Sequence, residues 1–146
     1  MFKKIIAIAS DHAGYELKVL LGETLELQGF SVLDLGTDGL QPVDYSDFAD
    51  DMAKVIRNKE VDRGVLICGT GIGISIAANR HTELRAALIH DALGARLSRQ
   101  HNDANIIVFG GRTIGTEVAK DCLDLFLSTE FEGGRHKQRI YKTSKI

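Results

Sequence analysis

Short apolar runs alternate along the chain with stretches in which apolar residues recur at helical spacing. The apolar runs have the length and composition of strands that are buried on both faces of a sheet. They predict five strands, over Lys4–Ser10, Ser31–Leu35, Arg63–Ile67, Arg85–Ile89 and Asn105–Phe109. The stretches with helical spacing predict helices over Tyr15–Gln28, Asp47–Asn58, Ile74–Arg80, Ala92–Gln100 and Thr113–Ser128, and a last helix within Glu132–Ile146.

This alternation of strands and helices favours an α/β fold, in which a parallel sheet carries helices on both faces. No internal repeat, low-complexity segment or linker interrupts the 146 residues, and this length fits one domain over residues 1–146. In such sheets, ligands bind beyond the carboxyl ends of the strands. The polar and glycine residues predicted at those ends are Asp11 and His12, Cys68 to Gly73, His90, and Gly110 to Arg112. Asp11 could position a polar ligand there, or it could only cap the turn that follows it.

The composition narrows the classes of protein without identifying one. Hydrophobic residues make up 44% of the chain and charged residues 26%, which is ordinary for a globular protein. A net charge of −2 gives no electrostatic reason to expect binding to nucleic acid or to a membrane surface. No apolar stretch approaches the roughly 20 residues of a membrane-spanning helix, and Asp11 and His12 interrupt the N-terminal apolar run too early for a signal peptide. We therefore expect a soluble, cytoplasmic protein.

The segment from Val61 to Arg80 carries the strongest chemical signal in the sequence. Its apolar run ends at Cys68, and the next residues, Gly69-Thr70-Gly71-Ile72-Gly73, place glycines at alternate positions before a predicted helix. Glycines allow the backbone to turn tightly and to bring its N–H groups against an anion, and a helix N-terminus supplies further donors. The segment therefore predicts a cradle for a phosphate or another anion. Strand-to-helix turns can also be rich in glycine for steric reasons alone, so this alternative stays open.

Cys68 stands at the edge of this loop and could have one of several roles. A zinc site would require a second cysteine within about two to four residues, and a thiol phosphatase of the Cys-x5-Arg type would require arginine in place of Ile74. A small buried hydrophobic residue is one remaining interpretation. The other is a catalytic thiolate, because the N–H groups of the loop and the helix N-terminus stabilise its charge. Cys122 falls in a helical pattern and is predicted to lie in the core, and two cysteines make no disulfide framework.

His101 is predicted at the C-terminus of a helix, where the helix dipole favours a protonated imidazole. It could therefore hold a proton for transfer near neutral pH, or it could simply face water. Its place at the far end of a helix makes it difficult to bring His101 into one site with Cys68 within a single chain. Three other histidines carry no comparable signal, and we interpret them as ordinary ones: His81, His90 and His136.

Arg135 and Arg139 are spaced i, i+4 in the C-terminal segment, with Lys137 and Lys142 nearby. Like charges at this spacing on a helix repel each other. A bound dianion would turn that repulsion into a clamp, because guanidinium groups match the geometry of a phosphate. A solvated basic tail is the alternative interpretation.

Five stretches, spread from one end of the chain to the other, match the motifs of a known family: Ser10–Gly14 (SDHAG), Val65–Arg80 (VLICGTGIGISIAANR), Leu97–Asn105 (LSRQHNDAN), Phe109–Arg112 (FGGR) and Glu132–Arg139 (EGGRHKQR). CGTGIGISIAANR and SRQHND are highly specific. On these motifs the chain closely resembles the ribose-5-phosphate isomerase B family, which also includes the subunits of galactose-6-phosphate isomerase.

The resemblance implies a Rossmann-like, three-layer α/β/α fold, with a five-stranded parallel sheet in the order 2-1-3-4-5 and a C-terminal helix. It also implies a homodimer whose two active sites lie at the interface, so that His101 can act in the site of a neighbouring subunit. Whether such dimers pair into tetramers is left open. The implied reaction interconverts ribose 5-phosphate and ribulose 5-phosphate through an enediolate, with no metal or other cofactor, in the non-oxidative branch of the pentose phosphate pathway.

The resemblance also implies roles for individual residues. Cys68 corresponds to the base that moves a proton between C1 and C2, Thr70 assists at the sugar oxygens, and His101 opens the furanose ring. Family members without this cysteine use a glutamate elsewhere, so the chain resembles the cysteine branch. The implied substrate-binding residues are Asp11, His12, Tyr45, Gly69, Gly71, Ile72, Gly73, Asn102, Arg112, Arg135 and Arg139. Among them the loop residues would form an anion hole, and the three arginines with the histidine would hold the phosphate.

One departure and two alternatives remain. Ser46 stands where many relatives have proline, which affects where the second helix begins. An isomerase of a hexose 6-phosphate, such as allose or galactose 6-phosphate, is one alternative, since the width of the pocket cannot be read from the residues. A sugar-phosphate-binding protein without catalysis is the other, although the presence of both Cys68 and His101 speaks against it.

Overall fold

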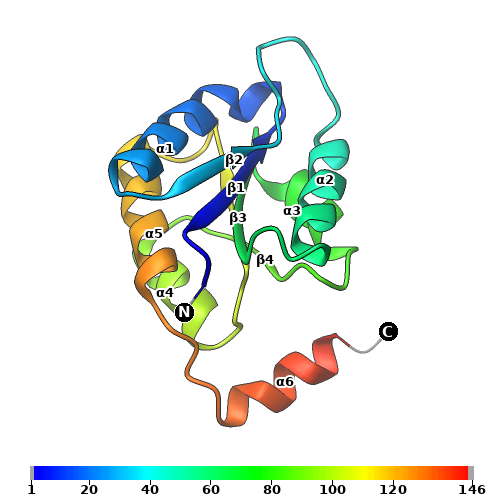
Figure 1. Ribbon diagram of the computed structural model, residues 1–146, viewed down its shortest axis with the longest axis vertical. Helices are drawn as coiled ribbons and strands as arrows, with labels where there is room; N and C mark the ends of the chain where they lie inside the picture. Colours follow the sequence, from blue (N-terminus) through cyan, green and yellow to red (C-terminus); the bar gives the residue numbers. More distant parts are fainter. Residues whose placement is uncertain (1, 145–146) are drawn as a thin grey trace.

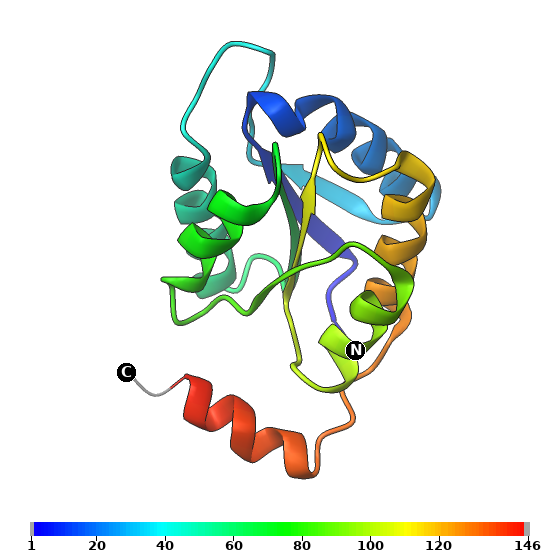
Figure 2. The ribbon, with the colours of Figure 1, turned by 180° about the vertical axis from the view of Figure 1, so that it is seen from behind.

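A parallel sheet lies between two layers of helices in the computed structural model, which describes residues 2–144 (Figure 1, Figure 2). The strands are β1 (Ile5–Ser10), β2 (Ser31–Asp34), β3 (Arg63–Cys68), β4 (Ala86–Leu88) and β5 (Ile106–Gly110). The helices are a short 3-10 turn η1 (His12–Gly14), α1 (Tyr15–Leu27), α2 (Tyr45–Arg57), α3 (Ile72–Asn79), α4 (Ala92–Gln100), α5 (Thr116–Ser128) and α6 (Arg135–Thr143). None of the helices within residues 2–144 combines the length and the apolar character needed to cross a membrane.

The strands pair in parallel throughout, in the order β2-β1-β3-β5-β4. The expected parallel sheet is therefore confirmed, but the expected order 2-1-3-4-5 is wrong for its last two strands. β5 lies beside β3, with Gly64 opposite Ile106 and Cys68 opposite Gly110, and β4 forms the edge. Burial gives the physical reason, because every residue of β5 is buried, whereas the short strand β4 is only half-buried. The more apolar run occupies the interior of the sheet, where both faces are covered.

The observed strand order also decides which face of the sheet carries α4. Right-handed crossovers place a helix on one face when the chain moves toward the β4 edge, and on the opposite face when it moves back toward β2. The connections from β1 to β2 and from β4 to β5 both move toward β2, so α4 shares a face with α1. α4 packs against α5 on that face, while α2 packs against α3 on the other (Figure 1). In the expected order, α4 would have joined α2 and α3.

Each face of the sheet has its own hydrophobic cluster. Leu21 and Phe126 belong to the cluster under α1, α4 and α5, and Met52 and Ile74 belong to the cluster under α2 and α3. Cys122 is fully buried in the first cluster, which confirms its predicted place in the core. Burial raises the pKa of the Cys122 thiol to about 11, so this thiol stays protonated at neutral pH.

The starts of α3 and α5 differ from the predicted ones for local reasons. α3 begins at Ile72, earlier than predicted, because Gly71 adopts a left-handed φ of +75° and turns the chain directly into the helix. α5 begins at Thr116, later than predicted, because the Gly110 carbonyl accepts a hydrogen bond from the Thr113 N–H at 3.0 Å and closes a turn first.

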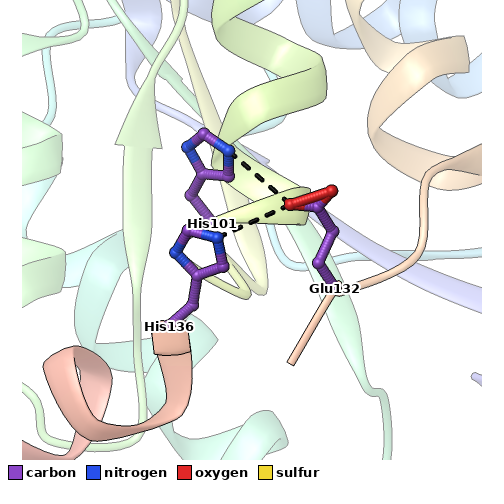
Figure 3. A group of neighbouring side chains, drawn as sticks. All are labelled: His101, Glu132 and His136. Atoms are coloured by element: carbon purple, nitrogen blue, oxygen red, sulfur yellow. Dashed lines mark ion pairs between the residues drawn. The ribbon is translucent and has the colours of Figure 1, made fainter. Parts of the chain in front are cut away.

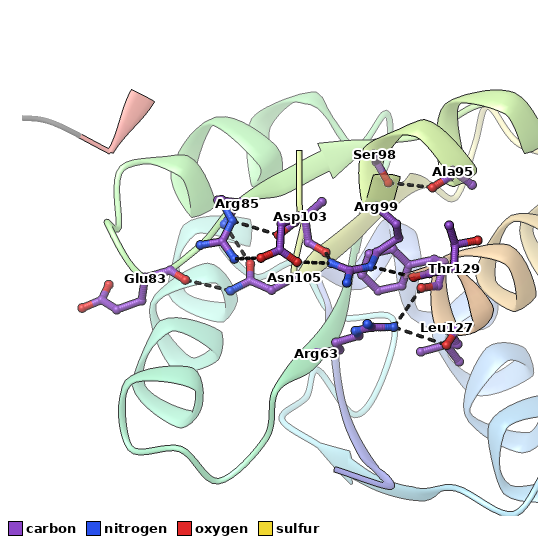
Figure 4. Close-up of polar contacts among 12 residues, drawn as sticks. Arg63, Glu83, Arg85, Ala95, Ser98, Arg99, Asp103, Asn105, Leu127 and Thr129 are labelled. Carbon is purple, nitrogen blue, oxygen red and sulfur yellow. Dashed lines mark hydrogen bonds and ion pairs between the residues drawn. The ribbon is translucent and has the colours of Figure 1, made fainter. Parts of the chain in front are cut away.

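The C-terminal helix α6 stands apart from the two layers, at the end of the sheet where the strands begin (Figure 1, Figure 2). Of its nine residues, His136 alone is buried. Two arginines hold the segment that leads to α6 (Figure 4): Arg99 Nε donates to the Thr129 carbonyl at 3.2 Å, and Arg63 Nη1 donates to the Phe126 carbonyl at 3.0 Å. Carbonyls at the end of a helix have no partner within it, so these guanidinium groups anchor the end of α5, from which α6 projects.

Candidate active site

Cys68 is the last residue of β3, the central strand of the sheet, and only 4% of it is exposed. Its carbonyl accepts a hydrogen bond from the Gly111 N–H at 2.8 Å, and the Gly69 carbonyl accepts one from the Arg112 N–H at 2.9 Å. These bonds tie the start of the glycine loop to the turn after β5. The loop is therefore held from two neighbouring strands, at the edge of the sheet where ligands bind in this class of fold.

Two positions of the loop require glycine. Gly71 has a φ of +75°, and a Cβ added there would lie 2.5 Å from Leu88 Cδ1 and 3.0 Å from the carbonyl carbon of Phe109. A Cβ added to Gly73 would lie 2.6 Å from the ring of Tyr45, so this ring packs directly against the loop. The glycines thus allow close packing of the loop against β5 and against the start of α2.

The loop leads into the N-terminus of α3 and presents donors there. The Ile72 N–H donates to Thr70 Oγ1 at 3.2 Å. The N–H groups of a first helical turn have no carbonyl partners within the helix, and the helix dipole gives this end a partial positive charge. Arg112 adds a full charge, because a Cβ added to Gly69 would lie 3.4 Å from Arg112 Nη1, which places the guanidinium over the loop. The loop can therefore stabilise negative charge beside Cys68.

Asp11 and His12 follow β1 and complete this end of the sheet. Asp11 Oδ1 accepts hydrogen bonds from the N–H groups of Ala13 at 3.0 Å and Gly14 at 3.1 Å, so Asp11 does cap the turn, one of its two expected roles. His12 Nδ1 accepts from the Val43 N–H at 3.2 Å. In a neutral ring the proton then lies on Nε2, which makes that atom a donor.

One group of predicted site residues thus lies together at the carboxyl end of the sheet. Its members are Asp11, His12, Tyr45, Cys68, Gly69, Thr70, Gly71, Ile72, Gly73 and Arg112. They supply a thiol, a hydroxyl, backbone N–H groups and two cationic or proton-donating side chains, which suits a small anionic ligand.

The remaining predicted residues lie at the opposite end of the sheet. His101 is the C-cap of α4, Asn102 follows it, and Arg139 lies on α6; these three side chains line one hollow of about 240 Å³. Arg135 begins α6. α4 has nine residues and runs back from the carboxyl ends of the strands, over roughly 13 Å. A single chain therefore does not bring His101 to Cys68, which agrees with the difficulty expected from the sequence.

A larger hollow, of about 400 Å³, lies between α6 and the edge strand β4. Asn79, Arg85, Asn102 and Ile140 are among its lining residues. Asn102 therefore faces both hollows, and neither hollow is lined by Cys68.

The structure reveals a cluster that the sequence did not predict, formed by His101, Glu132 and His136 (Figure 3). The two imidazole rings stack with their centroids 4.4 Å apart. Glu132 Oε1 lies 3.7 Å from His101 Nε2 and 3.5 Å from His136 Nε2. Burial lowers the pKa of His136 below its ordinary value, and the charges of His101 and Arg135 act in the same direction. The i, i+4 spacing of Glu132 and His136 was visible in the sequence, but only the fold brings His101 to them.

Comparisons with known proteins agree on one family. The profile described as Ribose/Galactose Isomerase matches residues 6–143. The chain is 45% identical to ribose-5-phosphate isomerase B of Escherichia coli, over 98% of this chain and 96% of that protein.

Solved structures give the same answer. A ribose 5-phosphate isomerase from Thermotoga maritima superposes with a TM-score of 0.96 at 50% identity, covering 97% of this chain and 98% of that one. Ribose-5-phosphate isomerase B from Mycoplasma genitalium, solved with bound ribulose-5-phosphate, superposes with a TM-score of 0.89 at 43% identity, covering 94% and 92%. The thiol at a glycine loop, the basic C-terminal helix and these matches lead to one conclusion: the chain belongs to the ribose/galactose isomerase family.

Proposed function

We propose that this chain interconverts D-ribose 5-phosphate and D-ribulose 5-phosphate, as a cytoplasmic enzyme of a single domain. The observation that carries the proposal is the position of Cys68, a thiol at the edge of a loop whose N–H groups and nearby guanidinium favour negative charge. Aldose–ketose isomerisation through an enediolate needs this combination, a base beside donors that are in place before the charge develops. The relative from Mycoplasma genitalium, with ribulose-5-phosphate bound, supports the choice of a pentose phosphate.

In the proposed reaction, the Cys68 thiolate takes the proton from C2 of the open-chain aldose. The electrons of that C–H bond form the C1=C2 double bond, and those of the C1 carbonyl move to O1, which gives the enediolate. The backbone N–H groups of the loop and the Thr70 hydroxyl stabilise the two oxygens. The proton then returns from the thiol to C1 and the proton on O2 passes to O1, so that O2 becomes the ketone oxygen and O1 becomes the hydroxyl of the ketose.

We propose that a second copy of the chain completes each site. His101, Asn102, Arg135 and Arg139 would come from the neighbouring subunit of a homodimer, with His101 opening the ring and the arginines binding the phosphate together with Arg112 and His12 of the first subunit. The position of these residues at the opposite end of the sheet supports this arrangement.

An exposed apolar surface beside the loop also favours a dimer. Ile72 and Ile76, on one face of α3, are each 53% exposed. Neighbouring apolar side chains at a helix surface are typical of contacts between subunits. The surface lies next to Cys68, so a subunit bound there could reach the site.

A cytoplasmic location is consistent with the cysteines. Cys68 and Cys122 are both free thiols, and free thiols persist in reducing compartments. The proposed base also requires a reduced Cys68.

The first test is turnover of ribose 5-phosphate by the purified protein in the presence of EDTA, with allose 6-phosphate assayed alongside. We expect fast conversion of the pentose phosphate. If only the hexose phosphate is converted, the proposed substrate is wrong, but the proposed roles of Cys68 and His101 still hold. No conversion of either sugar, with ribose 5-phosphate still bound, would favour a binding protein.

The second test is replacement of the base. Cys68→Ala should abolish turnover and leave binding of ribose 5-phosphate intact, because the thiol acts on the reacting carbon rather than on the phosphate. Cys122→Ala is the matched control, since it removes a buried thiol from the hydrophobic cluster on the other face of the sheet. A Cys68→Ala variant that keeps a kcat near that of the wild type would refute the assignment.

A further inference from the structure

The His101–Glu132–His136 cluster has the chemistry of a metal site. Each residue offers one ligand atom, and the three atoms all lie within 4.8 Å of one another. Both imidazole Nε2 atoms face the same carboxylate oxygen, Glu132 Oε1, as Figure 3 shows. Two imidazole nitrogens and a carboxylate oxygen form a ligand set that Zn²⁺ accepts, with a fourth position left for water.

The spacing of the ligand atoms fits a tetrahedral ion. Zn–N and Zn–O bonds of about 2.0–2.1 Å at the tetrahedral angle separate neighbouring ligand atoms by about 3.3 Å. The carboxylate oxygen lies 3.5 Å from one imidazole nitrogen and 3.7 Å from the other. All three atoms lie within 4.8 Å of one another, so the two rings would have to rotate toward the carboxylate oxygen to bring the three atoms onto one ion.

The backbone holds the ligands in place without an ion. The Glu132 N–H donates to the Gln100 carbonyl at 3.1 Å, which fixes Glu132 beside the end of α4 and hence beside His101. Gly133 and Gly134, with φ of +70° and +55°, then turn the chain into α6 and bring His136 back to the carboxylate. The ligands are thus positioned by two helix ends and one turn.

The surroundings allow an ion to enter and leave. The side chains of His101 and Glu132 are 38% and 49% exposed, whereas that of His136 is only 7% exposed. Arg135 and Arg139 repel a cation from nearby, so we expect weaker affinity than at a structural zinc site, and an exchangeable ion.

We propose that His101, Glu132 and His136 bind a divalent cation of the zinc type, and that the bound ion inhibits the enzyme. The inhibition rests on the proposed function, since the ion would occupy His101 Nε2 and withdraw this imidazole from ring opening. The ion is not a cofactor of the isomerisation in this proposal. Its binding is a property of the chain that can be measured without the reaction.

The binding test is a titration of the full-length, EDTA-stripped protein with Zn²⁺ against a chromophoric chelator. We expect one ion per chain. His136→Asn and Glu132→Gln should each weaken binding by more than tenfold, since even the loss of an outer partner of a ligand costs roughly 10–100-fold. His81→Asn is the matched control, because His81 forms a separate ion pair with Asp50 at 2.7 Å and should keep wild-type affinity.

Cys68 is the competing zinc ligand and needs its own control. Cys68→Ser should retain the ion, and Co²⁺ bound in place of Zn²⁺ should show no thiolate-to-cobalt charge-transfer band. Loss of binding in Cys68→Ser, or unchanged binding in both His136→Asn and Glu132→Gln with native circular dichroism, would overturn the proposed site.

The inhibition test compares each variant with its own rate in EDTA. Zn²⁺ should inhibit the wild type and His81→Asn, and inhibition of His136→Asn should require more than tenfold more Zn²⁺. If Zn²⁺ binds the cluster without slowing turnover, the inhibitory role is refuted but the metal site is supported. If the protein has no isomerase activity, the proposed function is wrong, and the binding test still decides whether the cluster binds a metal ion.

Discussion

Replacing Gly71 by alanine tests whether the loop after Cys68 depends on its left-handed backbone. An L-residue at a φ of +75° is strained by about 1–2 kcal/mol relative to glycine. The added methyl group would also lie 2.5 Å from Leu88 Cδ1 and 3.0 Å from the carbonyl carbon of Phe109. Leu88 can shift, but the buried backbone of β5 cannot, and overpacking of this kind costs about 1–3 kcal/mol. The free energy of unfolding should therefore fall by about 2–5 kcal/mol, a large share of the roughly 5–15 kcal/mol of a typical domain.

Urea denaturation at one protein concentration, followed by circular dichroism, measures this loss, and two glycines provide controls. Gly69→Ala lies in the same loop, where the new methyl group would meet Ala13 Cβ at 3.6 Å and the flexible end of Arg112 at 3.4 Å, so we expect a change below about 1 kcal/mol. Gly22→Ala, in α1 with open space around it, should stabilise by about 0.5–1 kcal/mol. If Gly71→Ala unfolds like Gly69→Ala and keeps full activity, the loop does not need its left-handed residue.

Three further changes test other parts of the molecule. Within residues 2–144, the Ser10 hydroxyl is buried without a hydrogen-bond partner. Ser10→Ala should therefore raise the free energy of unfolding by about 1 kcal/mol. Its control, Ser98→Ala, should lower the free energy of unfolding, because the Ser98 hydroxyl donates to the Ala95 carbonyl at 2.8 Å. Arg99→Lys should destabilise by about 3 kcal/mol, because the buried guanidinium serves two carbonyls and a carboxylate, whereas Arg96→Lys on the exposed side of the same helix should have little effect. The pKa of Cys122 rises on folding from 9.0 to about 11. The unfolded chain therefore releases this proton first, and the free energy of unfolding falls as the pH rises between these two values. Cys122→Ala should show a shallower fall over the same pH range. Denaturation curves with no difference between each variant and its control or wild type would contradict these three expectations.

Local signals in the sequence were sufficient to predict where some of the helices begin and end. α4 spans Ala92–Gln100 as predicted, and its N-cap is Asp91, whose Oδ1 accepts a hydrogen bond from the Gly94 N–H at 2.7 Å. α1 ends at Leu27 with Gln28 as its C-cap, and the φ of +91° at Gly29 explains why a glycine follows the cap. Caps and turns depend on residues within a few positions of each other, so a single sequence contains the information that determines them.

The order of β4 and β5 could not be derived in the same way. Both segments are short apolar runs followed by helices, and either order gives right-handed crossovers. The choice depends on which of the two runs packs better directly beside β3, and this contact joins residues that lie far apart in the chain. This choice also moved α4 to the face of α1 and α5, and with it His101.

By itself the sequence determined the alternation of strands and helices, the core position of Cys122 and the glycine loop beside Cys68. These features depend on the conformations and burial that neighbouring residues prefer. The tertiary structure alone decided that the predicted site residues form two groups at opposite ends of the sheet, and that Glu132 and His136 meet His101. Such meetings depend on strand order and on where α6 projects, and both are set by packing between segments that no local pattern of residues records.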